Sequence, residues 1–217
     1  SPEGLLALGD LVRSTGASLG IAHDGDADRA VFLDEQGRFI EENKEFALIA
    51  GQVFRARKGT IVMPVSTSRV VETIARNFGC DVKYTPVGSI YVARAMRALE
   101  AEGSPVAIGG EGNGGLIYPD HQYCRDGGMT AAMMITILAR ERCPVSELVA
   151  GLPEFHLIKE KIRGKDHASM IERLNSGFSG DSIDRTDGIR INRSDSWALV
   201  RPSGTEPLVR VIVESPQ

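Results

Sequence analysis

The spacing of apolar and polar residues predicts a different local structure in each of three parts of the chain. In the first part, leucine and valine recur at helical spacing over residues 5–12, and Gly16 is a plausible end for this helix. Short apolar runs follow at residues 19–23 and 30–33, and each run predicts a strand. The polar segment between the two runs is therefore expected to be a loop that connects two strands.

In the second part, from residue 43 to residue 142, apolar runs alternate with stretches of helical spacing. The predicted strands are residues 60–65, 80–87 and 105–111, and the predicted helices begin at Asn43, at the segment STS from Ser66 to Ser68, at Ser89 and at Asp126. Asn43 and the residues of STS are of the types that accept hydrogen bonds from the first turn of a helix. The alternation of strands and helices indicates an α/β unit with parallel strands.

After Pro153, predicted helices become rare and short strands follow one another closely. The predicted elements are a strand at 155–163, a helix at 167–175 and strands at 187–192, 196–202 and 208–215. Closely spaced strands with few helices indicate a separate α+β unit.

The composition of the 217 residues is that of an ordinary soluble protein, with 42% hydrophobic and 25% charged residues. A net charge of -4, with no run of lysine or arginine, gives no support for a nucleic-acid partner. The apolar run at 129–139 is too short to span a membrane. Cys80, Cys124 and Cys143 form no CxxC pair, which argues against a disulfide framework or a zinc site and fits a cytoplasmic location.

The segment DGDADR places Asp24, Asp26 and Asp28 at alternating positions in the predicted loop. In a straight strand the three carboxylates would spread over about 13 Å. Gly25 and Ala27 allow the loop to curl, so that the carboxylates converge. An all-oxygen, carboxylate-rich site is typical of Mg²⁺ or Mn²⁺.

The acidic segment has two alternative interpretations besides a loop that binds Mg²⁺ or Mn²⁺. With Glu35, the three aspartates match ligand positions of a calcium-binding EF-hand loop, but Arg29 stands where that loop needs glycine. The flanking segments also read as strands rather than helices, which disfavours the EF-hand. A solvated acidic turn without any metal is the second alternative, and the acidic motif alone leaves it open.

The segment GGEGNGG, residues 109–115, follows a predicted buried strand. Its glycines would let a ligand approach the backbone closely. Glu111 and Asn113 could then form hydrogen bonds with hydroxyl groups, as sugar binding requires. The segment does not lead into a helix and is therefore no dinucleotide-binding motif. A plain flexible loop remains the alternative.

The segment RPSGTEP begins at Arg201 and is followed by Arg210. Ser203, Gly204 and Thr205 can offer hydroxyl and backbone N–H groups in a tight concave turn, and such a turn binds anions. The guanidinium of Arg201 adds a fork that suits phosphate oxygens. A polar turn between strands is the alternative, and a P-loop is excluded because the chain has no Walker A motif.

Taken together and in this order, DGDADR, GGEGNGG and RPSGTEP resemble motifs of the α-D-phosphohexomutase superfamily, which includes phosphomannomutases, phosphoglucomutases and phosphoglucosamine mutases. The stretch TPVGSIYV, from Thr85 to Val92, is also similar to a family segment that lines the substrate cleft. The resemblance covers essentially the whole chain. It implies that residues 1–42 are the end of the family's second domain, 43–153 its third and 154–217 most of its fourth.

The resemblance implies an α/β fold with a mixed, mostly parallel sheet and flanking helices, preceded by the end of a similar domain and followed by a smaller α+β domain. In the family, a first domain carries the phosphoserine in a motif like TASHNP, and no such motif occurs here. The chain is therefore expected to be a fragment or a truncated product. Its expected partners are a hexose phosphate and the missing N-terminal domains, without which it should be inactive.

The resemblance also implies an activity and a set of site residues. The whole protein would be an intramolecular phosphotransferase that interconverts hexose 1-phosphates and 6-phosphates through a phosphoserine and a bisphosphate. Mg²⁺ would be held by Asp24, Asp26 and Asp28, with Arg29 as the catalytic residue beside the phosphoryl group. The residues expected to bind substrate are Thr85, Gly88, Glu111, Asn113, Arg201, Ser203, Gly204, Thr205 and Arg210.

Two departures from the family pattern bear on the substrate. Many relatives have serine at the position of Asn113 and histidine at that of Gly115. The form with glycine resembles archaeal-type members that act on phosphoglucosamine or phosphomannose, so these sugars are the expected substrates. A non-catalytic module that binds a phosphosugar is the alternative function.

Overall fold

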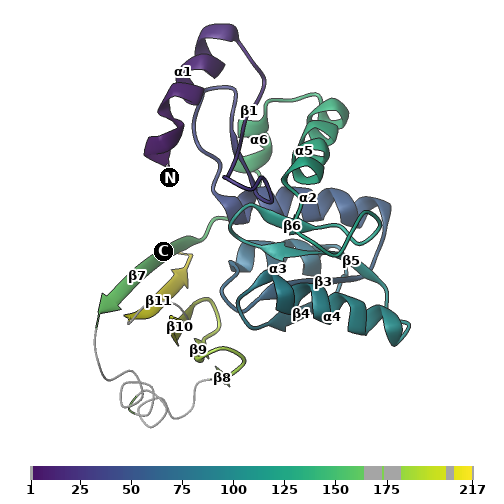
Figure 1. Ribbon diagram of the computed structural model, residues 1–217, viewed down its shortest axis with the longest axis vertical. Coiled ribbons are helices and arrows are strands. Elements are labelled where there is room, and N and C mark those ends of the chain that lie inside the picture. Colours follow the sequence, from purple (N-terminus) through teal and green to yellow (C-terminus); the bar gives the residue numbers. More distant parts are fainter. Residues whose placement is uncertain (1, 164–172, 174–181, 204–207, 217) are drawn as a thin grey trace.

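The computed structural model describes residues 2–163, 173, 182–203 and 208–216, and its strands form three sheets. Figure 1 shows a helix and a hairpin at one end of the molecule, an α/β unit in the middle and an antiparallel sheet at the other end. The order of these units along the chain follows the changes in apolar spacing described above.

The first unit is a short helical segment followed by a hairpin. Its elements are η1 (Pro2–Leu5), α1 (Leu6–Thr15), β1 (Gly20–His23) and β2 (Ala30–Leu33). Gly16 ends α1 in a left-handed conformation with a φ of 66°, as predicted, and its N–H donates to the carbonyl of Val12. Because β1 and β2 pair antiparallel, the acidic segment between them is the loop of a hairpin.

The middle unit contains a four-stranded sheet in the order β4-β3-β5-β6. Its strands are β3 (Thr60–Pro64), β4 (Val82–Thr85), β5 (Val106–Glu111) and β6 (Gly115–Ile117). β3 is parallel to β4 and β5, whereas β6 is antiparallel to β5. The sheet is therefore mixed and mostly parallel, which confirms the predicted fold class.

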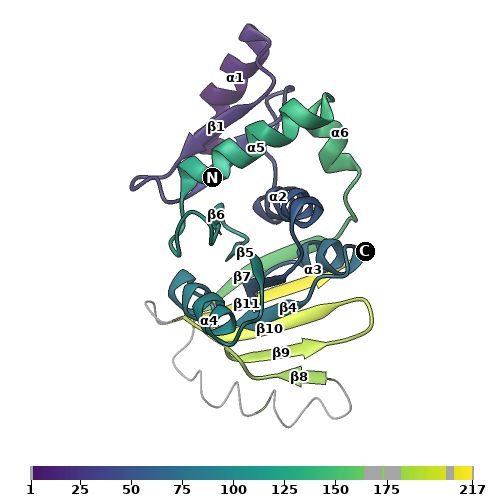
Figure 2. The same cartoon turned by 90° about the vertical axis from the view of Figure 1, so that its right-hand side faces the viewer.

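Helices cover both faces of this sheet, and Figure 2 shows α2 on one side and α4 on the other. The helices are α2 (Glu42–Ala56), α3 (Arg69–Asn77), α4 (Ser89–Ala101), α5 (Gly127–Glu141) and α6 (Val145–Ala150). One core cluster joins α2, α3 and α5 to Ile61 and Met63 of β3, and another joins α4 to Val62. Adjacent strand residues point to opposite faces, which explains this division. No helix in the described part of the chain is long and apolar enough to cross a membrane.

The start of α2 differs from the prediction, because its N-cap is Glu41 rather than Asn43. The carboxylate of Glu41 accepts hydrogen bonds from the backbone N–H groups of Asn43 and Lys44. The side chain of Asn43 donates to Glu41 and accepts from the backbone N–H of Ser68 at 3.0 Å. Asn43 therefore ties α2 to the start of α3. Glutamate is not a preferred cap residue, which is why the pattern pointed to Asn43.

The last unit is an antiparallel sheet in the order β7-β11-β10-β9-β8. Its strands are β7 (His156–Arg163), β8 (Ser182–Asp184), β9 (Ile189–Asn192), β10 (Trp197–Pro202) and β11 (Leu208–Ser215). All of these except β8 were predicted. The helix predicted at residues 167–175 lies outside the described residues, apart from Arg173.

A buried contact joins the last sheet to the middle unit. Glu214 of β11 is fully buried, and its Oε1 accepts hydrogen bonds from the backbone N–H of Arg69 at 2.8 Å and from Nε1 of Trp197 at 2.7 Å. The guanidinium of Arg190 lies 4.3 Å from the ring centroid of Trp197 and donates to the carbonyl of Val65 at 2.8 Å. These contacts fix the antiparallel sheet against the first turn of α3 and the residue that follows β3.

Candidate functional site

The acidic loop curls, as its sequence predicted. Each of Asp24, Asp26 and Asp28 offers a carboxylate oxygen, and these oxygens lie within 4.8 Å of one another. Ala27 adopts a left-handed conformation with a φ of 59°, which turns the chain back on itself. The N–H of Ala27 donates to the carbonyl of Asp24 at 3.1 Å and closes this turn. The loop therefore brings the three carboxylates to one place.

Two arginines partly neutralise these carboxylates. Nε of Arg29 donates to Oδ2 of Asp24 at 2.5 Å, and the backbone N–H of Arg29 donates to Oδ1 at 3.2 Å. Burial alone would raise the pKa of Asp24, but the hydrogen bonds and charge of Arg29 outweigh it and lower that pKa. Nη2 of Arg125 contacts Oδ2 of Asp28 in a second ion pair. Asp24 therefore stays ionised and available to a cation.

The acidic loop fits a divalent cation. Its three carboxylates exceed the two guanidinium groups that face them, so net negative charge remains. Oδ1 of Asp28 is buried and has no hydrogen-bond partner, although Nε of Arg29 lies 3.7 Å from it, and Asp26 is exposed. A buried carboxylate oxygen without a hydrogen bond gains from a cation that contacts it directly. An all-oxygen set of this kind suits Mg²⁺ or Mn²⁺.

The glycine segment packs against the acidic loop through backbone contacts. The N–H of Ala30 donates to the carbonyl of Gly114 at 3.0 Å, and a Cβ at position 114 would lie 2.3 Å from the carbonyl oxygen of Ala30. The N–H of Gly127 likewise donates to the carbonyl of Ala27 at 3.3 Å. Glycine is therefore required where the loops touch. The segment is a tight turn between β5 and β6 rather than a loose connection.

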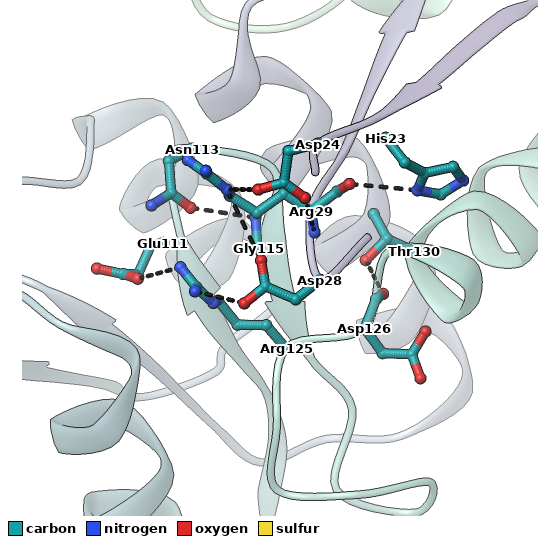
Figure 3. A network of polar contacts seen from close by, with 10 residues as sticks. All are labelled: His23, Asp24, Asp28, Arg29, Glu111, Asn113, Gly115, Arg125, Asp126 and Thr130. Carbon is teal, nitrogen blue, oxygen red and sulfur yellow. Dashed lines mark hydrogen bonds and ion pairs between the residues drawn. The ribbon is translucent and has the colours of Figure 1, made fainter. Parts of the chain in front are cut away.

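Glu111, the last residue of β5, and Asn113, in the turn after it, lie close to the acidic loop (Figure 3). Glu111 is buried; its Oε1 accepts a hydrogen bond from the N–H of Gly88 at 3.1 Å, and its Oε2 lies 3.4 Å from Nη1 of Arg125. Asn113 accepts a hydrogen bond from the N–H of Gly115 at 3.1 Å, which leaves its amide NH₂ directed elsewhere. Both side chains are thus held in fixed orientations.

Thr85 and Gly88 occupy the junction between β4 and α4. Gly88 is the residue before α4, has a φ of 133° and holds Glu111 through its N–H. Thr85 is buried, and its hydroxyl donates to the carbonyl of Pro86 at 2.9 Å. Gly88 therefore belongs to the cluster around Glu111, whereas the hydroxyl of Thr85 is already engaged within the protein.

A cleft of about 580 Å³ opens beside the acidic loop. Its walls come from the hairpin, the start of α2, the turn after β5 and the first residues of β7. The lining residues are Leu5, Ala22, His23, Asp24, Arg29, Val31, Phe39, Glu41, Glu42, Asn113, Leu157 and Lys159. The acidic loop and the antiparallel sheet therefore face a shared space.

Arg201 and Arg210 stand opposite each other on β10 and β11, and Lys161 of β7 stands opposite Arg210. Directly opposed residues of antiparallel strands point to the same face, so the three form a cationic row across the sheet. Nε of Arg201 lies 2.9 Å from Oδ2 of Asp187, and the same oxygen accepts a hydrogen bond from the N–H of Val87 at 2.9 Å. Asp187 thus ties the cationic row to the segment before α4.

The turn after β10 is only partly described. The N–H of Ser203 donates to the carbonyl of Leu208 at 2.9 Å, which closes the turn at its base. Gly204 and Thr205, two of the predicted phosphate-binding residues, lie outside the described residues.

The structure brings most of the predicted residues into one cluster. Asp24, Asp26, Asp28, Arg29, Gly88, Glu111 and Asn113 lie in it, whereas Arg201, Ser203 and Arg210 lie on the antiparallel sheet and are connected to it through Asp187. Sequence reasoning missed Arg125, Lys161 and Asp187. Cross-strand register could have identified Lys161, because the strands of Arg210 and Lys161 were both predicted.

Two family models match the chain. The model described as "Phosphoglucomutase/phosphomannomutase, alpha/beta/alpha domain III" matches residues 41–155, and that of the family's C-terminal domain matches residues 156–217. The chain belongs to the phosphoglucomutase/phosphomannomutase family. The resemblance stated from the motifs is thereby confirmed, and the antiparallel strands that flank the acidic loop exclude the EF-hand, which needs helices there.

Archaeal relatives of this family match almost all of the chain. A probable phosphoglucosamine mutase from Methanopyrus kandleri is 41% identical over 99% of the chain, and a phosphoglucomutase/phosphomannomutase from Thermococcus kodakarensis is 43% identical over 98%. The chain covers 47% and 46% of these relatives, respectively. It therefore spans about half the length of the curated relatives it matches.

Solved structures of the family have the same fold. A phosphoglucomutase/phosphomannomutase family protein from Burkholderia thailandensis superposes with a TM-score of 0.86 at 27% identity, over 100% of this chain and 46% of that one. N-acetylphosphoglucosamine mutase from Aspergillus fumigatus, solved with GlcNAc-6P and magnesium, gives 0.62 at 18% identity, over 96% of this chain and 49% of that one.

Proposed function

We propose that the protein to which this chain belongs is a phosphohexomutase that interconverts hexose 1-phosphates and 6-phosphates through a phosphoserine and a bisphosphate. The observation that carries the proposal is the convergence of carboxylate oxygens of Asp24, Asp26 and Asp28 within 4.8 Å, with Glu111 at the end of β5 linked to Asp28 through Arg125. The names of the archaeal relatives support phosphoglucosamine or phosphomannose as the substrate.

Asp24, Asp26 and Asp28 are the residues that would hold Mg²⁺. The Aspergillus fumigatus enzyme of the same fold was solved with magnesium, which supports this choice of ion. When bound, Mg²⁺ supplies positive charge that offsets the charge of a phosphoryl group during its transfer. Arg29 pairs with Asp24 at the edge of the cleft, where its outer guanidinium nitrogens can donate to phosphoryl oxygens.

The remaining residues would bind the two ends of the sugar. Glu111 and Asn113 offer an acceptor and an amide to sugar hydroxyls. Arg201 and Arg210, with Ser203, Gly204 and Thr205, would hold the phosphate that does not react. Fixing that distant phosphate positions the reacting hydroxyl, and positioning of this kind supplies much of an enzyme's rate.

The proposal includes a division into domains. Residues 1–42 would be the end of a second domain, 43–153 a third domain that binds the sugar, and 154–217 most of a fourth that binds phosphate. Because the chain covers about half of its relatives, the phosphoserine would come from N-terminal domains of the same protein. The chain alone is then expected to bind substrate without turning it over.

The decisive test is an assay of the full-length protein with Mg²⁺. We expect it to convert glucosamine 1-phosphate or mannose 1-phosphate to the 6-phosphate, and to lose this activity when the metal is removed with EDTA. Absence of turnover with every hexose phosphate would refute the proposed enzyme. Binding of glucosamine 6-phosphate without turnover by the full-length protein would instead support the alternative, a phosphosugar-binding module.

A further inference from the structure

Arg125 joins two parts of the site that lie far apart in the sequence. It stands between β6 and α5, 97 residues after Asp28 and 14 residues after Glu111. Nη2 of its guanidinium pairs with Oδ2 of Asp28, and Nη1 lies 3.4 Å from Oε2 of Glu111. Figure 3 shows the guanidinium between the two carboxylates.

We propose that Arg125 is a positioning residue that couples cation binding at the acidic loop to sugar binding at Glu111. This inference rests on the proposed function, because it assumes that the acidic loop takes a divalent cation and that Glu111 takes a sugar. It adds that the two ligands bind cooperatively and names the side chain through which they do so.

On the metal side, Arg125 fixes the orientation of one carboxylate. It occupies Oδ2 of Asp28 and leaves Oδ1, which is buried, has no hydrogen-bond partner and lies 3.7 Å from Nε of Arg29. A ligand whose second oxygen is held in this way presents its free oxygen in one direction. Removing a residue that hydrogen-bonds to a metal ligand typically lowers the metal affinity by about 10–100-fold.

On the sugar side, Arg125 is one of two donors that clamp Glu111. The N–H of Gly88 holds Oε1 at 3.1 Å, and Arg125 faces Oε2. With both oxygens held, the side chain cannot rotate, and only the remaining lone pairs face a sugar hydroxyl. When a cation draws charge from Asp28, the guanidinium is freer to interact with Glu111, and a bound sugar acts in the reverse direction. Coupling of this kind is reciprocal by thermodynamic necessity.

Gly115 provides the space in which Arg125 lies. A Cβ at position 115 would lie 2.4 Å from Cδ of Arg125, so any side chain there would displace the arginine. The backbone of Gly115 has an ordinary φ, and alanine is therefore tolerated by the backbone itself. Gly115 and Arg125 thus form a matched pair, which gives a physical reason for glycine at this position.

The test uses the full-length protein to which this chain belongs, and three variants of it. Arg125→Lys keeps the charge but loses the fork that reaches two carboxylates. Gly115→Ala keeps the arginine but displaces it. Arg140→Lys, on the exposed side of α5, is the matched control. For each protein, free Mn²⁺ measured by electron paramagnetic resonance gives the metal affinity, and calorimetry gives the affinity for glucosamine 6-phosphate, with and without the other ligand.

We expect the wild-type protein and Arg140→Lys to bind each ligand more tightly when the other is present. In Arg125→Lys both affinities should fall about tenfold, and each should become independent of the other ligand. In Gly115→Ala both affinities should fall by a smaller factor. If Arg125→Lys does not fold, the result for Gly115→Ala alone tests the role of Arg125. Unchanged cooperativity in a folded variant would overturn the role of Arg125 and leave the proposed function intact. A full-length wild-type protein that binds neither ligand would overturn both.

Discussion

Glu214, at the contact between the antiparallel sheet and α3, and Asp24 and Asp28 of the acidic loop are all carboxyl groups held by nitrogen donors, but the donors differ in kind. Glu214 is fully buried, and its Oε1 accepts from two neutral groups, a backbone N–H and an indole N–H, whereas its Oε2 has no hydrogen-bond partner. Asp24 and Asp28 remain partly exposed and are held by the guanidinium groups of Arg29 and Arg125.

The difference separates a structural carboxyl group from a functional one. Neutral donors at Glu214 are parts of α3 and of Trp197, so they cannot leave without breaking the fold. The guanidinium of Arg29, which holds Asp24, lies on a partly exposed side chain, where it can give way to a metal ion at small cost. A carboxylate that exchanges its partner for a ligand is therefore expected at a solvent-exposed site lined by arginine. A carboxyl group that keeps its partners permanently is expected at a site without water.

The largest effect is expected at the buried contact. Glu214→Ala leaves the N–H of Arg69 and the indole N–H of Trp197 without acceptors in a dry site, which should lower the free energy of unfolding by about 3–5 kcal/mol. Glu214→Gln keeps one acceptor and should cost less. Glu160→Ala, on an exposed position of β7, is the control and should stay within about 0.5 kcal/mol. Urea denaturation measures all three, and equal stability of Glu214→Ala and the control would contradict the structural role of Glu214.

In the acidic loop we expect a substitution to change stability little and activity strongly. Asp26 is exposed, so Asp26→Asn should leave the free energy of unfolding within about 0.5 kcal/mol of the wild type. In the full-length protein the same substitution should reduce kcat by about 10²–10³-fold, the usual cost of removing an electrostatic group from the reacting centre. Steady-state kinetics with Mg²⁺ measures this effect. The metal assignment fails if Asp26→Asn turns over substrate at the wild-type rate.

The fold was largely predictable because its signals are local. Alternating apolar runs and helical stretches predicted every strand of the two larger sheets except β6 and β8, which have three residues each and are too short to show a period. The N-cap predicted for α2 was wrong because the contact that decides it is not local. Asn43 has the residue type of a cap, but its partner is Ser68 on another helix, and only the tertiary structure brings the two together.

The site was predictable where its residues are neighbours in sequence. Asp24, Asp26 and Asp28 lie within five residues, so their convergence followed from the curl that Gly25 and Ala27 allow. Arg125 carried no such signal, because its contact with Asp28 spans 97 residues and depends on the packing of the turn after β5 against the hairpin. Asp187 and Val87 meet across 100 residues. Sequence motifs thus identify the side chains that would contact a ligand, whereas the residues that orient those side chains come from distant segments.

A third carboxyl group sharpens the comparison, because it has no donor at all. Glu45 is fully buried, and neither of its oxygens has a hydrogen-bond partner. Burial, with the nearby charges of Glu42 and Glu41, raises the pKa of Glu45 well above its ordinary value. The folded state therefore binds a proton that the unfolded state releases, so Glu45 lowers stability as the pH rises above about 4.5.

Glu45→Gln removes this proton linkage and should make stability less dependent on pH. Relative to the wild type, the variant should gain stability between pH 5 and pH 8, by about 1.4 kcal/mol for each unit by which the folded pKa exceeds the unfolded one. Glu102→Gln, at the exposed end of α4, is the control. Urea denaturation over this pH range measures both, and parallel pH profiles of wild type and Glu45→Gln would show that Glu45 does not carry a buried proton.

The smallest effect is expected in the cationic row, whose charge is opposite to that of the acidic loop. Lys161 is exposed and stands at the edge strand, beyond Arg210 and Arg201. If the row holds a phosphate, Lys161 contributes as an exposed charge, and Lys161→Ala should weaken binding of glucosamine 6-phosphate by about threefold.

This contribution should also shrink at high ionic strength, because salt screens exposed charges and affects the buried partners of a phosphate less. Lys58→Ala is the matched control, since Lys58 lies over the ring of Phe78 just before β3, at the end of the parallel strands opposite to the cluster around Glu111. Calorimetry at low and high salt compares the two variants. If both bind glucosamine 6-phosphate equally at low salt, the phosphate does not reach β7, and the row ends at Arg210. A loss that persists undiminished at high salt would instead place Lys161 in direct, desolvated contact with the phosphate.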